Sequence, residues 1–354
     1  MNIVQRIFHR PFFIRLFNWE YWGFISVYAW IYPVWIFFCI RARSFFFFSA
    51  SNPSIKNGGF IAESKKDIIS ILPPHRHPKT LFFDLPVNTD IVLMDLERAG
   101  MQYPLIGKPN VGGRGRGVKA LRDADDVREY VKKAFMDFHI QEYVSFKQEA
   151  GIFYYRYPDR AMGVVTGIVR KEFLSVTGDG KSTMRQILQR DKRSIMYLAA
   201  MERIHGAGLD KVLPAGETKI ISPYGNHARG SKFLDDSHLI DEEFTRMIDG
   251  LCKEIPDFYF GRLDIRYESW DLLKQGKNFC IIEVNGAGSE PTHMYDPKHS
   301  LFWAWKEIIR HWIILYHVSS KNHKLGHRYL SLREGIEMFR ESSRYDKMLA
   351  EMPE

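Results

Sequence analysis

The sequence has few cysteines, and those it has lack the spacing that functional cysteines show. Cys39, Cys252 and Cys280 are the 3 cysteines of 354 residues, each in an apolar setting. The 13 histidines contain no His-Glu-x-x-His pair, and no internal repeat or low-complexity segment occurs apart from one aromatic run. These absences exclude a disulfide framework and the common zinc motifs. We expect reduced cysteines, in keeping with an active site that faces the cytoplasm.

Acidic residues are also in the minority, because 50 lysines and arginines face 42 aspartates and glutamates for a net charge of +8. A basic protein suits an acidic partner, such as nucleotide phosphates or anionic lipid. Nucleic acid is not predicted as a partner, because no nucleic-acid recognition motif accompanies the charge. The length leaves room for two or three subdomains with their own cores.

The run Tyr21–Ile40 has no charged residue and is rich in tryptophan, tyrosine and phenylalanine. A helix needs about 20 apolar residues to cross a bilayer. The run therefore predicts a membrane-associated protein with a membrane lipid as partner and an active site on the cytoplasmic side. Pro33 leaves a single span, a re-entrant helix pair and in-plane helices open, and a buried core helix is the alternative.

Two segments near the C-terminus have helical patterns. Leu301–Tyr316 carries three tryptophans on a basic helix, which predicts either a second membrane-facing surface or a helix packed on the core. Ser331 followed by Glu334 is a capping-box pattern, so we expect a helix to begin there and form a C-terminal tail.

Two strands, Gly261–Arg266 and Cys280–Gly286, alternate apolar and polar residues and are separated by a polar turn near Gln275–Lys277. We expect them to form a β-hairpin. This hairpin is the most informative part of the chain, because of the side chains that it carries.

Alternation places Glu283 and Asn285 on one face of the second strand, and pairing across the turn places Asp264 opposite Glu283. Arg262 points the same way as Asp264. Two carboxylates and an amide oxygen suit Mg²⁺, with Mn²⁺ as an alternative metal. A charged, solvated hairpin face is the other interpretation of the same pattern.

Two glycine-rich segments follow a phosphate-binding pattern to different degrees. Pro104–Val118 predicts a strand that ends near Lys108 and continues into a glycine-rich loop, where backbone N–H groups can approach phosphate. Gly178–Thr183 has the end of a P-loop motif, but Ser175 stands where the first glycine belongs. We therefore expect Lys181 to lie in an ordinary turn.

The order of the elements resembles the ATP-grasp superfamily. A strand with Lys108, the glycine loop, a helix at 123–135, a strand at 139–144, Glu149 and a strand at 151–155 match its lid, and the hairpin matches its metal signature. The resemblance covers about residues 60–300. Local stretches are similar to cyanophycin synthetase at 176–187 and 212–217, and to D-alanine–D-alanine ligases at 285–292.

This resemblance implies an α+β ATP-grasp fold, in which two α+β subdomains clamp ATP, with a hydrophobic helical segment before them and a helical tail after them. The implied division is a membrane segment at 1–50, a reduced pre-ATP-grasp segment at 51–103, a lid at 104–170, a core with the metal site at 171–300, and helices at 301–354. The short segment before the lid departs from the family, whose ligases usually have a Rossmann-like domain there.

Roles for individual residues follow from the resemblance alone. Lys108 and Lys66 would contact phosphates, with Lys65 as the alternative to Lys66, and Arg262 would act with Lys108 on the transferring phosphoryl group. The glycine loop would close over the nucleotide, the segment after it would hold adenine and ribose, the hairpin would hold the metal, and four residues would contact substrate. The loop glycines are Gly112, Gly113, Gly115 and Gly117, and the residues for adenine and ribose are Gln141, Glu142, Tyr143, Val144 and Glu149. The metal ligands are Asp264, Glu283 and Asn285, and the substrate contacts are Arg170, Asn226, Gly288 and Ser289.

The predicted function is that of an ATP- and Mg²⁺-dependent carboxylate–amine ligase that works through an acylphosphate, on a lipid-linked or amphiphilic substrate. Two alternatives stay open. One is an ATP-grasp-type kinase that phosphorylates a head group or metabolite, and the other is a non-catalytic nucleotide-binding membrane protein. The acid and the amine themselves are not predicted.

Overall fold

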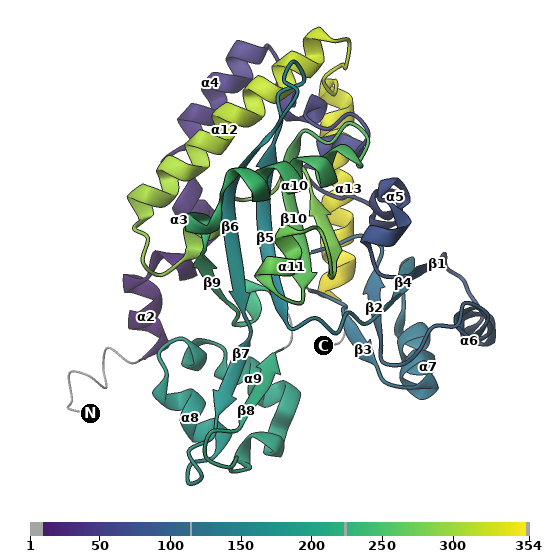
Figure 1. Cartoon of the computed structure of the whole chain (residues 1–354), viewed down its shortest axis with the longest axis vertical. Helices are drawn as coiled ribbons and strands as arrows, with labels where there is room; N and C mark the ends of the chain where they lie inside the picture. The colour runs from purple at the N-terminus through teal and green to yellow at the C-terminus, as the bar shows by residue number, and fades with distance from the viewer. Residues whose placement is uncertain (1–9, 114, 223–224, 352–354) are drawn as a thin grey trace. The chain divides into compact units, whose positions relative to one another are not determined.

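A computed structural model describes residues 10–113, 115–222 and 225–351 of the chain (Figure 1). The chain divides into two compact units, and each unit is built from separate stretches. Unit 1 comprises Met1–Pro33, Val169–Asp236 and Thr292–Glu307, and unit 2 comprises Val34–Ile168, Ser237–Pro291 and Ile308–Glu354. Nearly all of the predicted site residues belong to unit 2.

Unit 2 contains a four-stranded antiparallel sheet with two helices. Its strand order is β1–β4–β2–β3. The elements are β1 (Thr80–Phe83), β2 (Leu105–Pro109), β3 (Lys119–Leu121), β4 (Phe138–Glu142), α6 (Thr89–Arg98) and α7 (Ala124–Lys133). Of this group, β1 and α6 come from the segment 51–103 that was expected to precede the lid. The predicted helix is confirmed, because the Asp123 carboxylate caps α7 by accepting hydrogen bonds from the N–H groups of Asp125 and Asp126. Apolar side chains of both helices and all four strands share one core.

The second sheet of unit 2 carries the predicted metal hairpin. Strand β10 (Phe260–Tyr267) lies between β11 (Phe279–Asn285) and β5 (Gln148–Tyr155), and all three run antiparallel. The first part of β6 (Val164–Glu172), up to Ile168, follows β5. The predicted register is confirmed, because Asp264 lies directly opposite Glu283.

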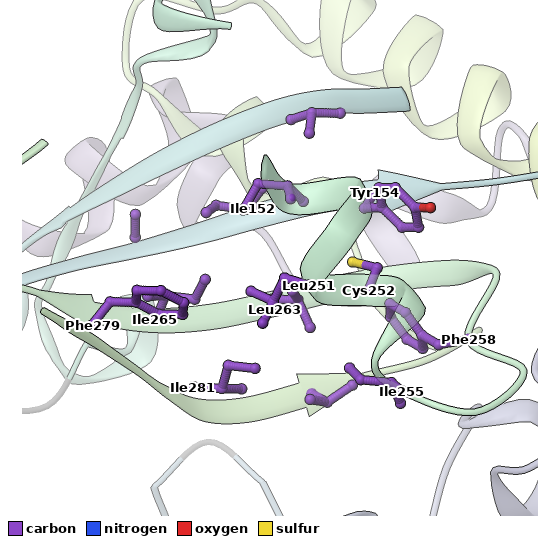
Figure 2. Close-up of a cluster of buried hydrophobic side chains, with 14 of the residues drawn as sticks. Ile152, Tyr154, Leu251, Cys252, Ile255, Phe258, Leu263, Ile265, Phe279 and Ile281 are labelled. Carbon is purple, nitrogen blue, oxygen red and sulfur yellow. The ribbon is translucent and has the colours of Figure 1, made fainter. Parts of the chain in front are cut away.

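One face of this sheet is apolar and covered by α10 (Glu242–Lys253) and α11 (Trp270–Lys274), as Figure 1 shows. Figure 2 shows the core beneath them, where Leu263 and Ile265 of β10 meet Leu251 and Cys252 of α10. Because side chains alternate along a strand, the residues between these apolar positions face the other side of the sheet. That side carries the candidate site.

Helices cover a further part of unit 2. The part of α4 (Tyr32–Ala42) within this unit packs on α12 (Leu301–Lys324), where Phe38 stacks on Tyr316 at 4.9 Å between ring centroids. Helix α5 (Lys65–Ile71) follows the aromatic segment 45–60, and α13 (Leu332–Ala350) forms the tail. The predicted capping box of α13 is confirmed, because Ser331 and Glu334 exchange both hydrogen bonds.

Unit 1 is smaller. Strands β7 (Leu174–Thr177) and β8 (Thr218–Ser222) pair antiparallel and pack with α8 (Met184–Arg190) and α9 (Leu198–His205) around one apolar core. The end of β6 pairs with β9 (Lys232–Asp235). The stretch before residue 34 adds α2 (Pro11–Phe17) and α3 (Phe24–Tyr28).

The predicted membrane localisation is wrong. The run Tyr21–Ile40 is not one helix, because α3 ends at Tyr28 and α4 begins at Tyr32, with Pro33 in its first turn, where the missing N–H is tolerated. Within the described residues, every helix is too short or too polar to cross a membrane. Several apolar side chains of this region pack inside the protein instead, among them Val27, Phe38 and Phe47. The lipid partner and lipid-linked substrate that rested on a membrane location therefore have no support.

Candidate active site

The polar face of the β10–β11 hairpin carries an arginine–carboxylate pair. Asp264 is only 3% exposed, and Arg262 holds both of its oxygens, with Nε 2.8 Å from Oδ1 and Nη2 3.3 Å from Oδ2. Arg262 Nη1 also donates to the carbonyl of Glu290 at 3.2 Å. Although burial opposes the charge, the neighbouring carboxylates raise the pKa of Arg262, so the guanidinium stays positive.

The other predicted metal ligands face the same side. Glu283 is opposite Asp264, and Asn285 is opposite Arg262. On the other flank of β10, Gly151 of β5 is opposite Asp264 and puts no side chain there. Among the described residues, the buried Nδ2 of Asn285 finds no hydrogen-bond partner. The unpaired Nδ2 is a hydrogen-bond donor and does not bind a cation, whereas the Asn285 amide oxygen and the two carboxylates are oxygen donors of the kind that hold a divalent cation.

The oxygen atoms of these residues are suitable ligands for Mg²⁺, but they are too few to complete its coordination shell. Within the described part of the chain, no three His, Cys, Asp or Glu side chains cluster to hold a metal, and the predicted set contains only two such residues. Arg262 occupies both oxygens of Asp264. A cation at this site would have to share Asp264 with Arg262, while Glu283 and Asn285 supply the other protein ligands.

Two lysines bring positive charge to this face. Lys108 lies in β2, where its Nζ donates to Gln141 Oε1 at 2.8 Å. Burial lowers the pKa of Lys108 to about 8, and the Glu283 carboxylate opposes this shift. Burial likewise lowers the pKa of Lys65, again against Glu283 and also Glu63. Both lysines therefore lie within electrostatic reach of the same carboxylate.

The geometry favours Lys65 over its neighbour Lys66 as the second phosphate lysine. Lys65 Nζ donates to the carbonyl of Gly112 in the glycine loop at 2.6 Å. Lys66 instead forms a solvent-exposed ion pair with Asp84 at 2.9 Å. Adjacent residues of a helix point in different directions. The sequence alone therefore could not show which of Lys65 and Lys66 contacts the glycine loop.

The glycine loop after β2 has backbone conformations that favour glycine, and Leu349 of α13 packs against it at Gly112. Gly112, Gly115 and Gly117 have φ values of +124°, +70° and +67°, a region that other residues rarely adopt. Within the described residues, the N–H groups of Gly112 and Gly117 donate no hydrogen bond to the protein. Gly113 has open space around its Cα. Two loop N–H groups thus remain available to an anion.

The predicted nucleotide-binding segment after β4 is joined to β10 by an arginine that the sequence analysis missed. Arg266 Nε is 3.2 Å from Glu149 Oε2, and its Nη1 donates to the carbonyl of Val144 at 3.1 Å. The guanidinium also lies 5.9 Å from the ring centroid of Tyr143. The sequence already indicated this position, because side chains alternate along a strand and Arg262, Asp264 and Arg266 therefore lie on one face of β10.

Other residues of that segment are engaged by the lid itself. Gln141 joins Lys108 to Thr80, to which its Nε2 donates at 2.9 Å. The N–H of Glu142 donates to the carbonyl of Lys79 at 2.9 Å. Gln141 is thus a side-chain support for the phosphate lysine rather than only a backbone contact.

The predicted substrate residues are in two places. The loop with Gly288 and Ser289 is tied to the segment before α5, since Gly288 N–H donates to the Gly59 carbonyl at 2.9 Å. The N–H and hydroxyl of Ser289 both donate to the Gly286 carbonyl. Arg170 and Asn226 belong to unit 1, where Arg170 pairs with Asp236 and Glu172 at 2.7 Å each. Gly288 and Ser289 belong to unit 2, and the substrate roles of all four residues stay predictions.

No protein-family model matches the chain, and no curated protein matches it in sequence. Three solved structures with similar folds are a bifunctional glutathione synthetase from Pasteurella multocida, the VanG D-Ala:D-Ser ligase from Enterococcus faecalis and a D-alanine–D-alanine ligase from Bacillus anthracis. Their sequence identities are 12%, 17% and 14%, over 70%, 68% and 72% of this chain and 35%, 57% and 67% of theirs. The TM-score is 0.38 for each.

The chain thus spans 35% to 67% of the lengths of these proteins. The predicted α+β class is confirmed by the antiparallel sheets and the helices at both ends of the chain, and the likeness to two D-alanine ligases agrees with the resemblance stated from the sequence. The likeness is loose in sequence and in superposition. Roles for individual residues therefore rest on the geometry of the site.

Proposed function

We propose that this chain is an ATP-dependent carboxylate–amine ligase whose active site is the polar face of the β5–β10–β11 sheet together with the glycine loop. The observation that supports this most is the meeting of opposite charges there. Two half-buried lysines, Lys65 and Lys108, interact with Glu283, which lies opposite Asp264 of the Arg262–Asp264 pair. Partly desolvated ammonium groups near carboxylates make a site for a polyanion with a divalent cation.

In this proposal, Lys108 and Lys65 contact the phosphates of ATP, and the free N–H groups of the glycine loop bind the terminal phosphate. Glu149 and the backbone of 142–144 hold the nucleoside. Glu283, Asn285 and Asp264 would hold Mg²⁺, which when bound offsets phosphate charge. Arg262 provides a fixed positive charge against the charge that develops on the transferring phosphoryl group.

The proposed reaction has two steps. An oxygen of the acid substrate attacks the γ-phosphorus of ATP, the bond to the bridging oxygen breaks, and ADP leaves. The amine then attacks the acylphosphate carbon, phosphate leaves, and the amine proton passes to solvent or a base. The site residues contribute by position and charge in both steps, as is usual for phosphoryl transfer.

Product analysis tests this proposal. The full-length protein is incubated with ATP, Mg²⁺ and mixtures of acids and amines, and ADP, phosphate and products are measured. A ligase releases ADP and phosphate only when acid and amine are both present, and hydroxylamine as the amine traps the acylphosphate as a hydroxamate. A phosphorylated product without free phosphate would identify a kinase, and absence of ATP binding would contradict both.

Adjacent lysines provide a matched pair of variants for the same assay. Lys65→Ala should weaken ATP binding about tenfold or more, as expected when a charged hydrogen bond is lost. Lys66→Ala removes only an exposed ion pair and should change ATP affinity less than about twofold. The reverse ranking, measured by isothermal titration, would return the phosphate role to Lys66.

A further inference from the structure

Arg266 connects three parts of the candidate nucleotide site. It leaves β10 on the same face as Arg262 and Asp264, directly opposite Glu149 in the register of β10 and β5. Its guanidinium reaches the Glu149 carboxylate through Nε and the Val144 carbonyl through Nη1. The planar fork of arginine suits this double contact, which a lysine ammonium can make only in part.

The Arg266–Glu149 pair is largely buried, so the charge and orientation of Glu149 depend on Arg266. Glu149 is 4% exposed, and the side chain of Arg266 is 13% exposed. A carboxylate this deep needs a positive partner to stay charged and in one orientation. The electrostatic influence of Glu149 also extends to Lys108.

We propose that Arg266 is a positioning residue that aims Glu149 at the sugar hydroxyl groups of the nucleotide and fixes the adjoining Val144 carbonyl. The inference rests on the proposed function, in which Glu149 binds the ribose. A carboxylate held in one orientation aims its oxygens at hydroxyl donors and so favours a ligand that carries them. If Arg266 is removed, the Glu149 carboxylate is no longer held in that orientation and this selectivity is lost. Preference for a ribose over a sugar without hydroxyls should therefore depend on Arg266.

The test compares two nucleotides on a set of full-length variants. Dissociation constants for ATP and for 2′,3′-dideoxy-ATP are measured by isothermal titration for the wild type, Arg266→Gln, Arg266→Lys and Glu149→Gln. Arg76→Gln is the matched control, because Arg76 also forms a forked pair with a glutamate, Glu254, away from the site. Thermal unfolding of each variant confirms that it is folded.

We expect the wild type to prefer ATP by about tenfold, the usual size for hydrogen bonds to a charged group. Arg266→Gln and Glu149→Gln should each reduce this preference at least threefold. A variant that combines Arg266→Gln with Glu149→Gln, measured in the same way, should reduce it no further, since both changes act on one interaction. Arg266→Lys should give an intermediate preference, and Arg76→Gln should keep that of the wild type.

Several results would overturn the inference. Equal weakening of both nucleotides by Arg266→Gln would mean that Arg266 contacts a group common to them, such as phosphate. An unchanged preference in Arg266→Gln, or a wild type without preference, would remove Arg266 from ribose recognition while leaving ATP binding in place. A wild type that binds neither nucleotide would contradict the proposed function as well. If Arg266→Gln does not fold, the preference of Arg266→Lys decides between these outcomes.

Discussion

Two glycine-rich loops of this chain carry a lysine and resemble phosphate-binding motifs, but their surroundings differ. In the loop at 112–117, two N–H groups of the described residues remain without protein partners, and the half-buried Lys108 on the preceding strand lies within electrostatic reach of Glu283. In the loop at 178–183, Asp179 already accepts the N–H groups of Lys181 and Ser182 at 2.9 and 2.6 Å. Lys181 itself is exposed.

The second loop uses its glycines for packing rather than for binding. A Cβ at Gly178 would lie 2.3 Å from the carbonyl oxygen of Pro214, so only glycine lets these two backbones approach. The carboxylate of Asp179 takes the position that an anion would need. The comparison teaches that a glycine motif indicates an anion site only where its N–H groups are left unpaired by the fold.

The largest expected effect concerns Glu283, which lies opposite Asp264 and within electrostatic reach of Lys108. Glu283→Gln should lower Mg²⁺-dependent ADP release by about 10²–10³-fold, because a lost metal ligand removes several kcal/mol of charge stabilisation from the transition state. Asp179→Asn, which changes the acid of the second loop, should leave the rate within about twofold. Equal rates for Glu283→Gln and the wild type would remove the hairpin from the active site.

An intermediate effect concerns the two lysines. Lys108→Ala should weaken ATP binding by about 10–100-fold, since it removes a half-buried cation from the phosphate site. Lys181→Ala removes an exposed side chain and should change ATP affinity less than about twofold. Isothermal titration of both variants checks the ranking, and a greater loss in Lys181→Ala would show that the two loops have been assigned the wrong way round.

The smallest effect is on stability and concerns the glycine that packs the second loop. Gly178→Ala should lower the free energy of unfolding by about 1–3 kcal/mol, the usual result of forcing an atom into a closed contact. ATP affinity of the folded fraction should not change. Gly208→Ala is the control, because a Cβ there meets nothing within 4 Å. Denaturant titration measures both, and equal stability of the two variants would contradict the packing role.

The site could be predicted from the sequence where a local pattern determines it. Period-two alternation correctly placed Asp264 opposite Glu283, and the Ser331–Glu334 capping pattern marked the start of the C-terminal helix. These predictions succeed because neighbouring residues alone decide which face of a strand a side chain occupies and which N–H groups a cap can reach.

Prediction was less successful where distant contacts decide. Arg266 was missed because its role depends on Glu149, which comes from a strand far away in sequence. The uncharged run before residue 41 predicted a membrane segment, since hydrophobicity shows that side chains avoid water but not what covers them. In the folded chain, Phe38 of this run packs on Tyr316 of α12.

The sequence by itself determined the strands, the caps, the glycine positions and the donor atoms of the candidate site, because these depend on residues within a few positions of one another. Only the tertiary structure decided which lysine turns toward Glu283, which glycine loop keeps N–H groups unpaired, and which strand supplies the partner of Glu149. Each of these depends on burial and on charges that meet across long separations in sequence, and such interactions arise only when the chain closes on itself.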